Sequence, residues 1–153
     1  MRTSVKRPRK NAGVVDFCIH AHSGHGQSVW FNPAKVIEAI QSGLPIYELD
    51  VLQASLNMPM ENLVPKLGIS KATLHRRKAK GRLGRDESDR VIRFARLMGK
   101  ALEVFESEDG ARRWLSSPQV GLGGAIPLDY AETEIGAREV EDLLGRIDYG
   151  VYS

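Results

Sequence analysis

The chain has 153 residues, and its 42% hydrophobic and 27% charged content is ordinary for a compact globular protein. No apolar run reaches the roughly 18 residues that a membrane span needs, and the basic N-terminus lacks the apolar stretch of a secretory signal. The single cysteine, Cys18, excludes an internal disulfide framework, so we expect a cytoplasmic protein with no membrane partner.

The net charge of +3 conceals a strong segregation of charge along the chain. Residues 1–10 carry five cations and no acids, and residues 66–100 carry twelve cations against three acids. Residues 101–153 reverse this balance, with four cations against eleven acids. A basic middle beside an acidic C-terminal third predicts two different partner surfaces, and nucleic acid is the natural partner of the basic one.

The N-terminal part of the chain gives weak structural signals. Residues 1–12 are typical of a disordered basic arm, and we assign no role to the segment 13–42. Apolar and polar residues alternate over residues 15–21, which predicts a strand with one buried face. Residues 28–31 would add a second strand and complete a short β-hairpin, and a helix would then run from Pro33 to Gly43.

Four potential metal ligands lie within this segment, in a C-x-H-x-H-x-x-H spacing: Cys18, His20, His22 and His25. The spacing matches no usual zinc pattern, and a strand would place the first three side chains on one face with weak convergence. We therefore interpret them as a solvated strand face and predict neither a metal nor another cofactor.

A helix-turn-helix pattern follows. Pro45 opens one helix, and a second short helix begins at about Pro59. Gly68 provides a tight turn into a third helix that is strongly basic, and this arrangement is typical of DNA-binding helix-turn-helix proteins. Pro65 departs from the pattern, because a proline inside the first helix of the pair removes a hydrogen bond.

The basic helix is expected to begin after the N-cap residue Ser70 and to end at Gly81 in the left-handed conformation. Long cations and a hydroxyl on one face suit contact with phosphates and base edges. A solvated basic surface is the alternative for such a helix in isolation, and the flanking pattern favours DNA. The residues predicted to bind DNA are Lys71, Thr73, Arg76, Arg77, Lys80 and Arg82.

Three further helices are predicted in the last part of the chain. An apolar stripe at helical spacing predicts the longest one over about residues 86–107, and a short one follows up to Pro118. The glycine-rich GLGGAIP is expected to be a loop. The last helix would cover about residues 133–146, with Ile135, Val140 and Leu143 facing inward.

No catalytic signature is present, so we predict that the protein is not an enzyme. The sequence GLGGAIP resembles a dinucleotide-binding fingerprint only superficially, because Ile126 occupies its third glycine position and no strand precedes it. The chain ends in Tyr149-Gly-Val-Tyr-Ser153, and exposed aromatic residues at a chain terminus are good anchors for a partner's cleft.

Four stretches of the sequence, in their order and spacing, resemble known antitoxins. They are GISKATLHRR, GRLGRDESDRVIRFARLM, ARRWLSSPQVGLGGAIPLDY and GAREVEDLLGRIDYGVYS. Over about residues 43–153 the chain resembles the Xre/MbcA/ParS-type antitoxins of bacterial RES–Xre toxin–antitoxin pairs. The family's TLxRR motif falls on Thr73 to Arg77, and its ESDR motif falls on Glu87 to Arg90.

The resemblance implies a mostly α fold, with an Xre-like helix-turn-helix domain at 43–107 and a small helical toxin-binding domain at 108–153. It implies a RES-domain toxin that depletes NAD as one partner and operator DNA, bound by a homodimer, as the other. In such antitoxins the C-terminal domain covers the entrance to the toxin's NAD site. The residues implied in toxin binding are Arg146, Tyr149, Gly150, Val151, Tyr152 and Ser153.

The alternative function is a stand-alone helix-turn-helix regulator whose C-terminal domain senses a small ligand. An enzyme that uses the histidine cluster as a metal site is a third and weaker hypothesis.

Overall fold

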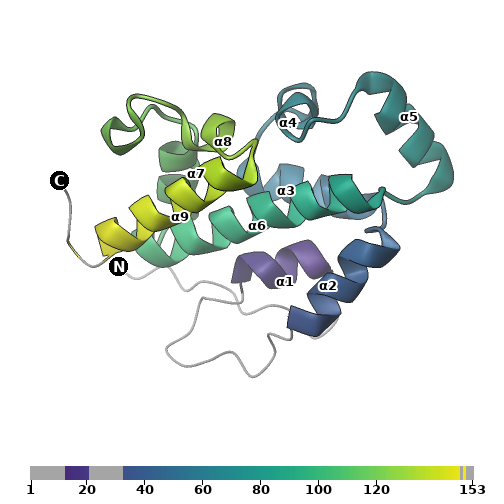
Figure 1. Cartoon of the computed structure of the whole chain (residues 1–153), viewed down its shortest axis with the longest axis horizontal. Helices are drawn as coiled ribbons and strands as arrows, with labels where there is room; N and C mark the ends of the chain where they lie inside the picture. The colour runs from purple at the N-terminus through teal and green to yellow at the C-terminus, as the bar shows by residue number, and fades with distance from the viewer. Residues whose placement is uncertain (1–12, 21–32, 149, 151–153) are drawn as a thin grey trace.

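The computed structural model describes residues 13–20, 33–148 and 150, and this part of the chain folds into helices without a sheet (Figure 1). The mostly helical fold predicted from the sequence is confirmed. No helix in the described ranges is long and apolar enough to cross a membrane. The elements are α1 (Val14–His20), α2 (Pro33–Ser42), α3 (Tyr47–Leu56), α4 (Met60–Lys66), α5 (Lys71–Lys80), α6 (Arg85–Phe105), α7 (Glu108–Leu115), η1 (Val120–Leu122, a 3₁₀ helix), α8 (Pro127–Tyr130) and α9 (Glu134–Asp148).

Helix α6 is the central element of the fold. Its apolar stripe is buried along most of its length, and α1, α2, α3, α7 and α9 all pack against it (Figure 1). Helix α1 approaches it closely at Gly99, where an added Cβ would lie 2.7 Å from the carbonyl oxygen of Ile19 and 2.8 Å from that of Cys18. A side chain at position 99 would therefore push α1 away from the core.

The predicted strand over residues 15–21 is wrong, because residues 14–20 form helix α1. Val15, Cys18 and Ile19 are buried at the spacing of a helical face, which a short apolar run does not distinguish from a strand. The carboxylate of the buried Glu48 accepts hydrogen bonds from the backbone N–H groups of Val14 (2.8 Å) and Val15 (3.0 Å). This capping group comes from α3, so the local sequence gives no sign of it.

The interpretation of the Cys/His cluster as a solvated face is wrong for Cys18, which is only 1% exposed. His20 is partly buried, and its Nδ1 lies 2.9 Å from the carbonyl oxygen of Asp16. His22, His25 and the predicted second strand at 28–31 lie outside the described residues. Within the described ranges, no cluster of His, Cys, Asp and Glu side chains could hold a metal ion.

The helices of the predicted helix-turn-helix pair form as α4 and α5. Ser70 is the N-cap of α5, where its Oγ accepts from the N–H of Thr73 at 3.1 Å, and Gly81 ends the helix at φ 76°. Pro65 lies in the last turn of α4, where it removes the hydrogen bond from position 65 to the carbonyl of Glu61, and the helix ends one residue later. Gly68 then makes the turn at φ 68°.

The C-terminal helices differ from the sequence prediction in two details. Two short helices that the sequence did not predict, η1 and α8, flank the glycine-rich stretch and overlap its ends, while residues 123–126 between them are not helical. Ile135 is 78% exposed, so its predicted inward orientation is wrong. Gly136 faces inward instead, because α9 packs so close to α8 that a Cβ there would overlap the carbonyl oxygen of Tyr130 at 1.6 Å.

The burial of Cys18 makes its thiol unreactive in the native protein. Burial is the main cause and raises the pKa of the thiol to about 11, while the nearby Arg96 lowers it and Glu48 raises it to smaller extents. We expect a maleimide at about pH 8 to label native protein only as fast as α1 leaves α6, because the thiolate is the reacting species. Rapid labelling of native protein, at the rate seen in denaturant, would contradict the docking of α1.

Candidate nucleic-acid and toxin interfaces

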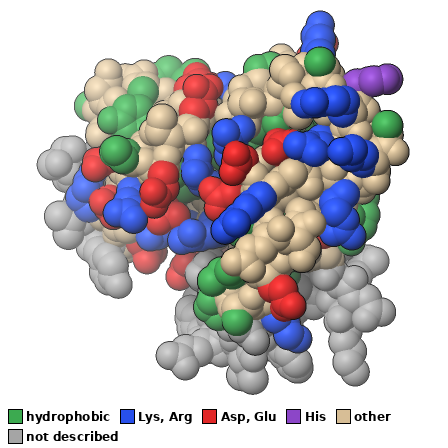
Figure 2. Space-filling view, turned by 45° about the vertical axis from the view of Figure 1, so that its right-hand side comes forward, with side chains coloured by type: hydrophobic (Ala, Val, Ile, Leu, Met, Phe, Trp, Pro, Cys, Tyr) green, Lys and Arg blue, Asp and Glu red, His purple; other side chains and the backbone are tan. Residues whose placement is uncertain are grey.

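Helix α5 extends away from the body of the protein (Figure 1, right) and buries none of its side chains fully. Leu74 is its partly buried contact with the hydrophobic core. Lys and Arg side chains gather over this helix in the upper right of Figure 2. A helix this polar, with no fully buried side chain, presents most of its side chains to solvent or to a partner.

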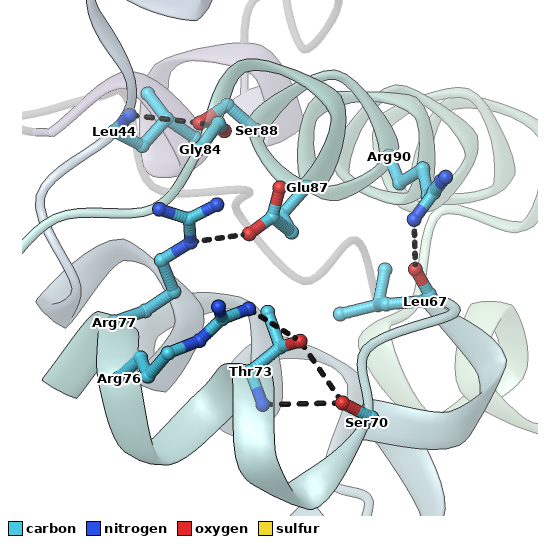
Figure 3. A network of polar contacts seen from close by, with 10 residues as sticks. All are labelled: Leu44, Leu67, Ser70, Thr73, Arg76, Arg77, Gly84, Glu87, Ser88 and Arg90. Atoms are coloured by element: carbon cyan, nitrogen blue, oxygen red, sulfur yellow. Dashed lines mark hydrogen bonds and ion pairs between the residues drawn. The ribbon is translucent and has the colours of Figure 1, made fainter.

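The N-terminal turn of α5 holds a small hydrogen-bond network (Figure 3). The hydroxyl of Ser70 donates to Thr73 Oγ1 at 2.9 Å, and Arg76 Nη2 donates to the same oxygen at 3.2 Å. Thr73 is partly buried beneath this network, whereas Arg76 remains exposed. The N-terminal turn therefore orients one exposed guanidinium, at the part of a recognition helix that usually meets base edges.

The six residues predicted to bind DNA fall into two groups in the structure. Lys71, Arg76 and Lys80 are exposed on α5, with Thr73 against Arg76. Arg77, which is partly buried, and Arg82, which is exposed, both contact other parts of the protein. Arg82 Nη1 donates to the carbonyl oxygen of Gly43, and Arg77 is paired with Glu87 of α6.

The Arg77–Glu87 pair is short and largely shielded from solvent. Arg77 Nε lies 2.7 Å from Glu87 Oε1, and the two side chains are 27% and 10% exposed. Gly84 makes room for the pair, because a Cβ there would lie 2.6 Å from Glu87 Oε2 and 2.7 Å from Arg77 Nη2. The pair thus closes directly over the backbone at the start of α6.

The pKa of Glu87 is lowered in spite of this burial. Burial is the largest effect and acts to raise the pKa, but hydrogen bonds from its own backbone N–H and from Arg77, together with the charge of Arg77, outweigh it. Glu87 therefore stays ionised at neutral pH. The stability that it contributes is present above the ordinary glutamate pKa and is lost as the pH falls through the lowered value.

Two neighbours of Glu87 join the same turn of α6 to other parts of the helix-turn-helix (Figure 3). Ser88 Oγ accepts from the N–H of Leu44 at 2.8 Å, next to the segment that leads into α3. Arg90 Nη1 donates to the carbonyl oxygen of Leu67 at 3.2 Å, at the end of α4. One turn of α6 thus fixes α4, α5 and the chain before α3.

The C-terminal helices present exposed apolar side chains. Val120 is 85% exposed, Ile135 78% and Tyr130 41%, and hydrophobic side chains gather over η1 and α8 in the upper left of Figure 2. Exposed apolar area of this kind is typical of interaction surfaces. Trp114 is partly buried, and its ring centroid lies 5.7 Å from that of Phe105.

Of the residues implied in toxin binding, the structure describes the side chain of Arg146 and the backbone of Gly150. Arg146 is exposed in the last turn of α9, and Gly150 has φ 71° with open space around its Cα. Tyr149, Val151, Tyr152 and Ser153 lie outside the described residues.

Polar contacts join the helix-turn-helix to the C-terminal helices. Lys66 at the end of α4 pairs with Asp129 of α8. Arg112 of α7 donates through Nε to the carbonyl oxygen of Ser55 in α3 at 2.7 Å. The two surfaces therefore belong to one packed body with α6 between them.

Comparison with known families assigns the two regions. Residues 35–96 match the antitoxin Xre-like helix-turn-helix domain, and residues 100–150 match the antitoxin Xre/MbcA/ParS C-terminal toxin-binding domain. The chain belongs to this antitoxin family. It is therefore an antitoxin of a toxin–antitoxin system, with a helix-turn-helix domain.

Curated relatives of the antitoxin agree. It is 36% identical to Antitoxin Xre of Yersinia enterocolitica over 120 residues, which cover 77% of this chain and 81% of the relative. It is 34% identical to Antitoxin Xre of Photorhabdus laumondii over 116 residues, 74% of this chain and 78% of the relative. It is 29% identical to the Prs ADP-ribosylating antitoxin of a Sphingobium species over 132 residues, 80% of this chain and 83% of that protein.

Sequence reasoning missed one exposed cation of the antitoxin and the environment of another. Lys78 is exposed on α5 but lies off the face that carries Thr73, Arg76 and Lys80. The pairing of Arg77 with Glu87 joins residues ten positions apart. The sequence feature that could have indicated this pairing is Glu87 in the first turn of the long helix, three residues after Gly84.

Proposed function

We propose that this antitoxin neutralises a RES-domain toxin by covering the entrance to its active site, and represses its own operon by binding operator DNA through α5. The observation that carries the DNA-binding part is the set of exposed cations on a helix that buries no side chain and lies within the Xre-like match. The observation that carries the toxin-binding part is the match of residues 100–150 to the toxin-binding domain.

The charge of α5 supports DNA as its partner. Lys71, Arg76, Lys78 and Lys80 are all exposed, and within the described chain none of them pairs with an acid. Neutralising phosphates with such cations releases counterions, which drives binding and makes it sensitive to salt. One helix reads only a short half-site, so a homodimer on a two-fold symmetric operator is part of the proposal.

The acidic C-terminal third supports a toxin that handles an anionic dinucleotide. Such a toxin should have a positive cleft, and an acidic surface is complementary to it. The proposal places Arg146 at the rim of the cleft and the tail, Tyr149 to Ser153, inside it. Each large apolar side chain of the tail would contribute roughly 1.5–3 kcal/mol if fully buried.

The first prediction concerns the exposed cations. We expect Arg76→Ala with Lys80→Ala to weaken binding to the DNA upstream of the antitoxin gene. The slope of log affinity against log salt should flatten by about 0.9 for each phosphate that the variant no longer neutralises. Arg113→Ala, which removes an exposed cation from α7, is the matched control and should change neither quantity. A double variant that behaves like the wild type would rule out α5 as the DNA-binding helix.

The second prediction concerns the tail. Deletion of residues 149–153 should leave thermal stability and DNA binding intact, because the segment follows the last helix, α9. The same deletion should release NAD-degrading activity from the co-purified toxin–antitoxin complex. Equal and complete inhibition by full-length and truncated antitoxin would show that the tail is not required. Inhibition would then have to come from the helical surface around Val120 and Ile135.

A further inference from the structure

The direction of α5 is not set by a hydrophobic face. None of its side chains is fully buried, and Leu74 is its partly buried apolar contact. Backbone contacts hold its C-terminal end, where the carbonyl oxygen of Gly81 accepts from the N–H of Ile46 at 3.0 Å. A helix attached in this way can tilt about its ends, because helices in globular proteins are usually held by packing of an apolar face.

A single side-chain bond links α5 to another helix within the described part of the chain, and this bond is the Arg77–Glu87 pair. It acts from the first turns of α6, where Ser88 and Arg90 fix the neighbouring segments. Glu87 itself is buried, so its carboxylate occupies a defined position to which Arg77 is drawn.

The adjacent residues Arg76 and Arg77 leave α5 in different directions. Successive side chains of an α-helix are rotated by about 100°, given 3.6 residues per turn. Arg77 therefore reaches inward to Glu87 while Arg76 lies over Thr73 on the exposed side (Figure 3). The two arginines of the TLxRR motif have different environments, and only Arg76 is presented to a partner.

We propose that Arg77 and Glu87 are positioning residues that fix the angle of α5 for DNA recognition, and that Arg77 does not itself contact the DNA. The proposal rests on the proposed DNA-binding function of α5. It gives the TLxRR and ESDR motifs a joint role, since Arg77 comes from the first and Glu87 from the second. Breaking a shielded pair leaves an uncompensated charge, so loss of either partner disturbs the helix.

The effect of Glu87→Gln on DNA affinity distinguishes a positioning role of the pair from simple charge attraction between α5 and DNA. Glu87→Gln removes a negative charge next to a DNA-binding helix, and by charge alone this change would strengthen DNA binding. The Arg77–Glu87 pair predicts the opposite, a loss of about tenfold in affinity for the upstream DNA, the size of one charge-assisted hydrogen bond. Asp86→Asn is the matched control, because Asp86 is an exposed acid in the same turn and should not weaken binding.

The salt dependence provides the second readout. Arg77→Lys keeps the charge and the alkyl stem, so it is the milder variant. It should lower the affinity for DNA at every salt concentration and leave the slope of log affinity against log salt unchanged. Arg77→Ala should also keep the slope, whereas Arg76→Ala should flatten it by about 0.9. Circular dichroism melts establish that each variant is folded at the assay temperature.

Either of two results would overturn the proposal. One is a folded Glu87→Gln variant that binds the DNA as tightly as the wild type or more tightly. The other is a slope of log affinity against log salt that flattens as much for Arg77→Ala as for Arg76→Ala, because this result would make Arg77 a phosphate contact. If Arg76→Ala and Lys80→Ala also leave binding unchanged, the DNA-binding role of α5 itself fails, and the two failures are distinguishable.

Discussion

An ion pair between Arg77 and Glu87 connects α5, the proposed recognition helix, to α6, the central helix of the fold. α5 cannot be both a polar, exposed helix and a well-packed one, because the side chains that would fill a core are replaced by lysine and arginine. In the structure an ion pair, and not the packing of an apolar face, joins α5 to α6. A buried carboxylate at the start of α6 and a glycine beside it hold one arginine of α5, and the other cations remain exposed.

Helix α6 belongs to both of the matched domains of the antitoxin. Its first turns contact α4 and α5, whereas its remaining length packs against α7 and α9 of the toxin-binding region. The boundary between the two family matches, after residue 96 and before residue 100, falls inside this helix. The two regions therefore share one helix, and contacts such as the Lys66–Asp129 pair hold them together beside it.

The sequence predicts those features of the fold that are encoded by neighbouring residues. The N-cap at Ser70, the left-handed Gly81 and the long apolar stripe of α6 were all predicted, because each depends on a few adjacent side chains. α1 was assigned to the wrong structure because its cap, Glu48, is more than thirty residues away. The environment of Arg77 was missed for the same reason, since its partner lies on another helix.

The central claim is that Arg77 holds α5 in place while Arg76 meets the DNA. The most direct test is nitrogen-edited NMR of the arginine Nε–H groups, with and without the DNA upstream of the antitoxin gene. The account predicts a slowly exchanging Arg77 signal that keeps its chemical shift when DNA is added, and an Arg76 signal that shifts. An Arg77 signal that exchanges rapidly in the free protein, or that moves on DNA binding while Arg76 stays unchanged, would contradict it.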